Sequence, residues 1–331
     1  MLKSFVQAFA LCLWILPGLA HAQKLERAVL AYGSTGPNLT PFWVAREAGL
    51  HRQYGLDVDL VFFRGSTIAI NALATRDAHF GSFGASSSVL AKIGGVDTVL
   101  IATATPGLLF YLVTRKEIRN ANDLKGKKIA VSRPGTDSDL AARVAVQKLG
   151  LPEKDVQIIS MGTDAERIAA MTQRIADATV LTIGGYVAAQ KLGFHSILDL
   201  SQANVPYEAA SLITTRTLIK ENPEMVRNFV KGFVAAIQYA QTHREATLKI
   251  LSKYMRTSDA EILNASYDYY VGRVIPRTPY VSEKGLQAVI DFIRQRNPQV
   301  PNVKPQEFMD NRFIKELDES GFIKSLYANP S

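Results

Sequence analysis

Residues 128–150 read KIAVSRPGTDSDLAARVAVQKLG and decide the fold: they contain, in order, a short apolar strand, a polar loop and an amphipathic helix. The strand covers 129–131, the loop covers 132–138, and the helix covers 140–149. Gly150 stands where a helix end favours a left-handed residue. A strand that leads directly into a helix is half of a βαβ unit, so the stretch predicts an α/β fold with a mainly parallel sheet flanked by helices.

The same plan occurs earlier in the chain. There the apolar strand 28–32 is followed by the turn cluster 33–37 and by a helical segment at 42–47. Further matched pairs lie 97 to 101 residues apart: Gly49-Leu50 with Gly150-Leu151, Asp57-Val58 with Asp155-Val156, and Gly65-Ser66 with Gly162-Thr163. Two copies of one α/β unit predict a two-lobed protein and not a solenoid.

Two extended segments, far apart in the sequence, are the candidates for joining the lobes. The first, 98–114, is interrupted by Pro106-Gly107, and the second is 208–215. We expect these crossover strands to act as the hinge between lobe one and lobe two. The predicted boundaries are 24–107 plus 212–331 for lobe one and 108–211 for lobe two.

The C-terminal part of lobe one is predicted to be helical. Asn222 is placed to cap a helix that has Pro223 at its first position. Ser258 and Glu261 have the spacing of a capping box, so they predict the start of a further helix.

The composition excludes several classes of protein. The chain of 331 residues is 47% hydrophobic and 21% charged, which is typical of a globular protein and excludes disordered and fibrous classes. Lys and Arg exceed Asp and Glu by 38 to 30, but the basic residues are scattered. Because nucleic-acid binding needs a concentrated basic patch, we expect no nucleic-acid partner.

Residues 1–22 have the pattern of a cleavable signal peptide. Lys3 precedes the mostly apolar stretch 5–16, and Ala20-His21-Ala22 forms an A-x-A cleavage site. The apolar stretch is too short to span a bilayer, which disfavours the alternative of a retained anchor helix. The single cysteine, Cys12, lies inside this segment. We therefore expect an exported protein whose mature chain contains no cysteine.

The sequence contains none of the common catalytic or cofactor motifs. Gly-x-Ser-x-Gly, Gly-x-Gly-x-x-Gly, the phosphate loop and His-Glu-x-x-His are all absent. The five histidines occur singly, which disfavours a metal site. We therefore expect a binding protein that is not an enzyme and needs no cofactor or metal.

Ligands of parallel α/β sheets collect at the carboxyl ends of the strands, where helix N-termini present N–H groups. Hydroxyl-rich loops occur at these positions in both predicted lobes. The candidate ligand-binding residues are Ser34, Thr35, Asn38, Gly65, Ser66, Thr67, Ser86, Ser87, Arg133, Thr136, Asp137 and Gly184.

Several of these residues have a second interpretation. Ser86 and Ser87 suit helix capping or ligand contact better than nucleophilic catalysis, because the sequence predicts no base beside them. Arg133 is placed either to clamp an anion or to lie in an exposed loop. Asp137 in the same loop either pairs with Arg133, caps the helix, or attracts a cationic group. The ligand is therefore expected to be a small organic anion, with a cationic group left open.

Several segments together resemble a known protein family. They are FWVAREAGL at 42–50, the helix that starts at 65 and ends in RDAHF at 76–80, DLKGKKIAV at 123–131, NPEMV at 222–226 and DESGF at 318–322. In this order, and over essentially the whole mature chain, they resemble the nitrate/sulfonate/taurine-type periplasmic solute-binding proteins of ABC importers. That family belongs to the type II periplasmic binding protein superfamily, in its thiamine-pyrimidine-synthase-like branch.

This resemblance implies a type II periplasmic binding fold, a small solute held between the lobes, a periplasmic location, delivery to an ABC permease in the inner membrane, and a monomer. Relatives that make the thiamine pyrimidine carry a cysteine-rich iron motif, which is absent here. An exported enzyme and a receptor that feeds a sensor remain the alternatives on the same fold.

Overall fold

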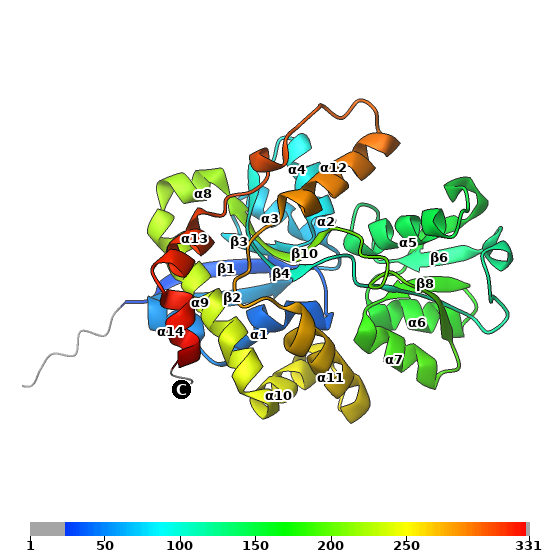
Figure 1. Ribbon diagram of the computed structural model, residues 1–331, viewed down its shortest axis with the longest axis horizontal. Helices are drawn as coiled ribbons and strands as arrows, with labels where there is room; N and C mark the ends of the chain where they lie inside the picture. Colours follow the sequence, from blue (N-terminus) through cyan, green and yellow to red (C-terminus); the bar gives the residue numbers. More distant parts are fainter. Residues whose placement is uncertain (1–23, 329–331) are drawn as a thin grey trace, which may run out of the picture.

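The computed structural model describes residues 24–328, which form two α/β lobes lying side by side (Figure 1). Each lobe is built on one five-stranded sheet flanked by helices. The predicted signal peptide, residues 1–22, lies outside the described residues. The prediction of a two-lobed α/β fold is confirmed.

The first sheet has the strand order β2-β1-β3-β10-β4. Its strands are β1 (Glu26–Tyr32), β2 (Leu56–Phe62), β3 (Phe80–Phe83), β4 (Thr98–Pro106) and β10 (Glu208–Thr215). β1 pairs in parallel with β2 and β3, whereas β10 is antiparallel to both β3 and β4. All strands except β10 therefore run in one direction.

The second sheet repeats this arrangement with the order β7-β6-β8-β5-β9. Its strands are β5 (Tyr111–Thr114), β6 (Lys128–Val131), β7 (Gln157–Ser160), β8 (Ala178–Leu181) and β9 (His195–Asp199). β6 pairs in parallel with β7 and β8, and β5 is antiparallel to β8 and β9. Here β5 is the single reversed strand, so the internal repeat read from the sequence corresponds to two sheets of one topology.

The chain passes between the sheets twice, from β4 to β5 and from β9 to β10. In both cases it enters the new sheet through the reversed strand. The two connections lie together, because the Gly107 N–H donates to the Tyr207 carbonyl oxygen at 2.7 Å and the Leu108 N–H donates to the Val205 carbonyl at 3.3 Å.

The change of sheet before β10 lies upstream of the expected boundary at 211/212. Glu208 already pairs with Pro106, and Ala209 with Thr105, in the first sheet. Residues 208–211 therefore belong to the sheet of lobe one. The apolar pattern of an extended segment is the same on both sides of a crossover, so the sequence does not mark this point.

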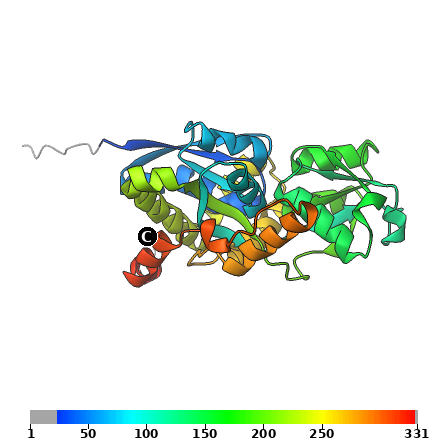
Figure 2. The same cartoon turned by 90° about the horizontal axis from the view of Figure 1, so that it is seen from above.

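Helices cover both sheets. Those of the first lobe are α1 (Thr40–Glu47), α2 (Ser66–Ala69), α3 (Asn71–Ala74), α4 (Ala85–Ile93), α8 (Arg216–Glu221), α9 (Pro223–Thr242), α10 (Arg244–Met255), α11 (Ala260–Ser266), α12 (Glu283–Arg296), α13 (Arg312–Glu319) and α14 (Phe322–Ala328). Those of the second lobe are α5 (Asp137–Lys148), α6 (Asp164–Thr172) and α7 (Ile183–Lys191). Figure 2 shows the C-terminal helices gathered mainly on the first lobe, with α12 extending beside the second.

Shorter helical turns complete the chain. They are the 3-10 turns η1 (Pro37–Leu39), η2 (Leu50–Tyr54), η3 (Asn122–Leu124), η4 (Glu153–Asp155) and η6 (Pro305–Glu307), and the π-helical segment η5 (Tyr267–Val274). Within residues 24–328, none of the helices combines the length and the apolar character needed to cross a membrane.

The ends of the C-terminal helices test two predictions. Asn222 caps α9 through its side chain, which accepts from the Met225 N–H at 3.0 Å, with Pro223 in the first helical position. The prediction of a capping box at Ser258 is wrong, because Asp259 is the cap of α11 and accepts from the N–H groups of Glu261 and Ile262. A carboxylate accepts such bonds more strongly than a hydroxyl does, and it stands one residue closer to the helix.

The core of lobe one forms where α9 packs on α1 and η2. Phe229 and Phe233 of α9 are fully buried, and Phe229 stacks on Phe80 with ring centroids 3.8 Å apart. His51 of η2 lies within this apolar contact, with its ring 4.3 Å from that of Phe229. Burial lowers the pKa of His51 to about 3, so the imidazole is neutral in the folded protein.

This burial makes the stability of lobe one depend on pH. The folded pKa of His51 lies below its ordinary value, so the unfolded chain binds the proton more tightly, and stability falls as the pH drops from about 6.5 toward 3. At pH 5 the loss is about 2 kcal/mol relative to pH 7.5. We expect His51→Leu to remove this part of the acid sensitivity, measured by urea unfolding followed through the fluorescence of Trp43. If the free energy of unfolding depended on pH in the same way in the wild type and in His51→Leu, the acid sensitivity would not come from His51.

Candidate functional site

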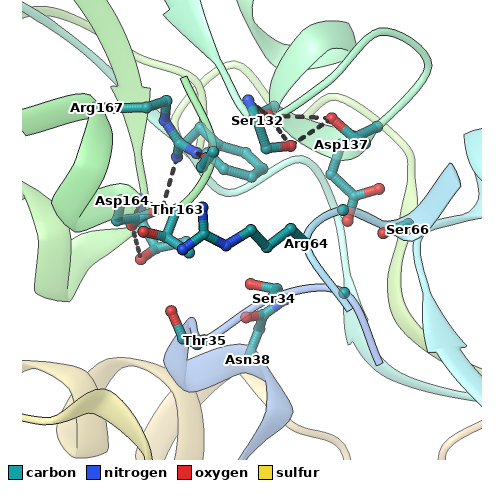
Figure 3. A pocket seen from close by; sticks show the side chains of 17 residues that line it. Ser34, Thr35, Asn38, Arg64, Ser66, Ser132, Asp137, Thr163, Asp164 and Arg167 are labelled. Atoms are coloured by element: carbon teal, nitrogen blue, oxygen red, sulfur yellow. Dashed lines mark hydrogen bonds and ion pairs between the residues drawn. The ribbon is translucent and has the colours of Figure 1, made fainter. Parts of the chain in front are cut away.

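A cavity of about 60 Å³ lies between the two lobes (Figure 3). Its walls are the loops that connect β1 to α1, β2 to α2, β6 to α5, β7 to α6 and β8 to α7, together with the crossover between the sheets. The lining residues are Gly33, Ser34, Thr35, Asn38, Arg64, Gly65, Ser66, Phe110, Ser132, Thr136, Asp137, Ser138, Gly162, Thr163, Asp164, Arg167 and Thr182. The cavity therefore receives helix N-termini from both lobes at the carboxyl ends of parallel strands.

The loop after β1 presents polar groups without fully pairing them. The Ser34 Oγ accepts from the Gly36 N–H at 3.0 Å, which fixes the turn before η1. Asn38 is 8% exposed, and its Oδ1 finds no hydrogen-bond partner among the described residues. A buried amide oxygen without a partner costs free energy, so this side chain is available to a ligand.

The loop after β2 brings a cation to the mouth of the cavity. The Arg64 guanidinium lies 3.2 Å from the Glu166 carboxylate of the other lobe, and its side chain is 70% exposed. The Arg64 backbone carbonyl accepts from Nε of Arg133, also of the other lobe, at 2.6 Å. The loop is thus held across the cleft by its backbone, while its charged group stays close to solvent.

The polar side chains that line the cavity from the second lobe are already hydrogen-bonded to one another. The buried Arg167 guanidinium donates to the Gly162 carbonyl at 2.6 Å, the Thr179 Oγ1 at 3.1 Å and the Val180 carbonyl at 3.0 Å. It also pairs with Asp164 at 2.5 Å. Asp164 in turn accepts from the Thr182 hydroxyl at 3.0 Å. These bonds fix the loops after β7 and β8 to each other, so Arg167 has little capacity left for a ligand.

Asp137 occupies a different kind of position. It starts α5 and lies deep in the protein with part of its surface open to the cavity. Its Oδ1 accepts from the Tyr207 hydroxyl at 2.7 Å, and a Cβ on Gly84 would come within 1.6 Å of the same oxygen. Burial raises the pKa of the Asp137 carboxyl to about 6, against the opposing effect of the Tyr207 hydrogen bond.

Comparison with known sequences identifies the chain's family. The sequence model of the NMT1/THI5-like family matches residues 36–247, more than half of the chain. The chain belongs to the NMT1/THI5-like family. A relative from Brucella abortus, named only as a binding protein, is 26% identical over 261 residues, which cover 77% of this chain and 79% of the relative.

Solved structures share the fold of this NMT1/THI5-like protein. The periplasmic aliphatic sulphonate binding protein SsuA of Escherichia coli aligns with a TM-score of 0.70 at 21% identity, over 86% of this chain and 92% of SsuA. The periplasmic nitrate-binding protein NrtA of Synechocystis PCC 6803 aligns with a TM-score of 0.73 at 13% identity, over 93% of this chain and 92% of NrtA. The resemblance read from the sequence is thereby confirmed.

The structure brings many of the candidate residues of this family member together. Those that line the cavity are Ser34, Thr35, Asn38, Gly65, Ser66, Thr136 and Asp137. Thr67 follows them as the second residue of α2. These residues come from three loops of two lobes, so they meet only because the sheets face each other.

The remaining candidates lie outside the lining. Both Ser86 and Ser87 donate through their hydroxyls to the Gly135 carbonyl of the other lobe, at 3.2 and 3.1 Å. Arg133 bonds the Arg64 carbonyl, so it holds the lobes together, and it does not pair with Asp137. Gly184 is buried in α7 where a Cβ would come within 2.6 Å of the Ser266 hydroxyl of α11.

Sequence reasoning missed three lining residues of a different character: Arg64, Phe110 and Arg167. Arg64 directly precedes the candidate Gly65, so its place in the loop is a signal that could have been used. Arg167 lies one helical turn after Asp164, where an arginine is common on a solvated face. Only the fold shows that this side chain turns inward. Among residues 24–328, no group of histidines and carboxylates is arranged to hold a metal ion.

We predict that Arg167 is a structural residue of lobe two. In Arg167→Met the partly exposed Asp164 carboxylate and the buried Val180 carbonyl both lose their donor, which costs about 3–5 kcal/mol of folding free energy. Arg167→Met combined with Asp164→Asn should recover part of this loss, because the unpaired charge is removed. Urea unfolding followed by circular dichroism measures both effects. Arg174→Met, at an exposed arginine just beyond the same helix, is the control, and equal losses in the two single variants would contradict the prediction.

Proposed function

We propose that this protein is the solute-binding component of an ABC importer and that it captures a small organic anion in the cavity between its lobes. The observation that carries the proposal is the convergence of helix N-termini and hydroxyl-rich loops from both lobes on one cavity. We further propose that the chain is exported to the periplasm by the signal peptide 1–22 and acts as a monomer with an ABC permease as its partner. The sulphonate- and nitrate-binding proteins with the same fold support this function.

The chemistry of the lining favours an anionic group. Helices α5, α6 and α7 begin at the cavity, and the N–H groups of a helix N-terminus attract negative charge. Arg64 adds a guanidinium at the mouth. The unpartnered Asn38 Oδ1 is an acceptor, so it suits a hydroxyl or N–H group elsewhere on the same solute. The carboxylate of Asp164 does not oppose this charge, because Arg167 neutralises it.

Capture requires the lobes to close on the solute, and the contacts across the cleft suit a reversible closure. On one side Lys191 of α7 bridges the N-cap residue Asp259 and Glu261 of α11, at 2.5 and 2.9 Å. On another side Arg296 of α12 pairs with Glu153 of η4. Partly exposed ion pairs contribute little free energy each, so a bound solute that touches both lobes is able to shift the balance toward the closed state.

The first test is native mass spectrometry of the mature protein purified without added ligand. A small anion released unchanged supports the receptor, and a thermal-shift panel of sulfonates and carboxylates follows if the protein is empty, because a tight ligand raises the melting temperature. A bound compound that is converted to a product would support an enzyme instead. Absence of any bound anion and of any shift would contradict the proposal.

We predict that Arg64→Gln weakens the binding of the identified anion by about tenfold to a hundredfold, which is the range for one charge-assisted hydrogen bond. Isothermal titration calorimetry measures the change. Arg76→Gln is the matched control, because Arg76 is also 70% exposed and also pairs with one surface carboxylate, that of Glu221. Equal affinities of the two variants for the anion would show that Arg64 does not contribute to binding.

A further inference from the structure

The surroundings of Asp137 are unusual because the other lobe completes them. The carboxyl belongs to lobe two, yet it lies against the backbone of Gly84, at the end of β3 in lobe one. The Asp137 side chain accepts a hydrogen bond from the Tyr207 hydroxyl. None of the ion pairs within residues 24–328 includes Asp137, so this half-buried carboxyl lies against the other lobe without a partner of opposite charge.

Tyr207 joins the elements that must move relative to each other. Its side chain is buried, and its hydroxyl accepts from the Ser86 N–H at 3.2 Å and lies 2.8 Å from the Ser86 hydroxyl, at the start of α4 in lobe one. The same hydroxyl donates to Asp137, at the start of α5 in lobe two. Its backbone carbonyl accepts from Gly107 of the other crossover. One residue of the hinge therefore contacts both lobes and both connections.

We propose that closure of the cleft takes up a proton on Asp137, with Tyr207 as the positioning residue that connects this carboxyl to lobe one. The inference rests on the proposed function, since it concerns how the receptor closes around its solute. When the lobes separate, Asp137 loses the cover of Gly84 and becomes hydrated. When they meet, an ionised carboxylate would have to be enclosed without a cation, whereas a protonated carboxyl keeps a hydrogen bond with the Tyr207 oxygen.

The direction of the pH dependence follows from the difference in the pKa of Asp137 between the closed and the open state. In the closed arrangement burial raises the pKa of Asp137 to about 6, whereas a hydrated aspartate has an ordinary pKa of about 3.9. The closed state therefore binds the proton more tightly, so acid favours closure. Between these two pKa values the ratio of closed to open molecules should rise by about fivefold to sevenfold per pH unit, and it should stay nearly constant above pH 7.

Other charged groups around the cavity do not reproduce this behaviour. Arg167 is paired with Asp164, Asp139 is paired with Arg143, and Arg64 is paired with Glu166. Tyr207 and Tyr270, which also lie near Asp137, are buried, and burial raises the pKa of each phenol well above 10. Arg133 in the same loop bonds a backbone carbonyl. Asp137 is therefore the group in this region whose protonation changes between pH 7 and pH 5.

A carboxyl buried within lobe one provides a control. Glu208 begins β10, is 1% exposed, and lies within lobe one, where a Cβ on Gly285 would come within 2.2 Å of its Oε1. Burial raises the pKa of Glu208 to about 7. Its neighbours Thr103, Ser282 and Gly285 all belong to lobe one, so its proton is linked to the folding of that lobe and not to the contact between lobes.

Closure can be followed without any ligand, because the region 24–328 contains no cysteine and accepts engineered labels. Cysteines at the exposed positions Gln53 of lobe one and Gln173 of lobe two carry a donor and an acceptor dye. Energy transfer is then measured from pH 8 to pH 4.5, with small-angle scattering of the unlabelled protein as a second reading of compactness. We expect the closed fraction to rise as the pH falls, with the ratio of closed to open molecules increasing about 25-fold between pH 7.5 and pH 4.5.

Three variants test whether Asp137 is the group whose protonation favours closure. Asp137→Asn keeps the shape of the side chain without the titration, so its closed fraction should be independent of pH and high throughout. Tyr207→Phe should close less than the wild type at pH 7.5, because the ionised carboxylate loses its donor. Glu208→Gln should titrate like the wild type.

A flat profile for the wild type, or the same profile in Asp137→Asn, would overturn the inference. Because no solute is present in these measurements, either result would leave the receptor function standing. Failure to find a solute by mass spectrometry would likewise leave the closure measurement valid.

Discussion

Buried polar groups need hydrogen-bond partners, and this requirement determines which side chains of the cleft are free. The polar groups of lobe two are already paired with one another, whereas lobe one leaves one of them unpaired. In lobe two the Arg167 guanidinium satisfies the carbonyls of Gly162 and Val180 and the carboxylate of Asp164, so the loops after β7 and β8 form a finished surface. In lobe one the Asn38 amide oxygen stays without a partner. In the receptor that we propose, a solute with a hydrogen-bond donor therefore gains more from lobe one, and lobe two is suited to close over it.

The contacts between the lobes also divide into two kinds. Ion pairs such as Lys191 with Asp259 lie near the surface, where water screens them and replaces them when the lobes part. The contacts around Tyr207 lie inside the hinge, where breaking them requires water to enter. The surface pairs therefore add little free energy to the contact between the lobes, and in the proposed closure the contacts around Tyr207 set most of the free-energy difference.

The sequence predicted the repeated α/β plan and many residues of the cleft because both follow from local patterns. Strand, polar loop and helix are adjacent in the chain, so Ser34, Ser66 and Thr136 were found from their loops alone. Which lobe a loop residue contacts depends on how the two sheets are placed relative to each other, and local sequence patterns do not record this. Ser86 turns toward the Gly135 carbonyl, and Gly184 packs on α11, because of how the sheets are placed. Arg167 was missed for the same reason: its helix pattern does not reveal that a guanidinium has four partners inside the lobe.

One glycine of the sequence reflects the contact between the lobes, although this is recognisable only in the structure. Gly84 has a φ of −78°, an ordinary value that any residue adopts, so its backbone gives no reason for a glycine. A side chain there would collide with the Asp137 carboxyl of the other lobe. Gly65 makes similar room for the Arg133 side chain, but its φ of +100° already favours glycine. Gly84 thus has one physical explanation, the contact between lobes, which indicates that this chain is built to bring Asp137 against lobe one.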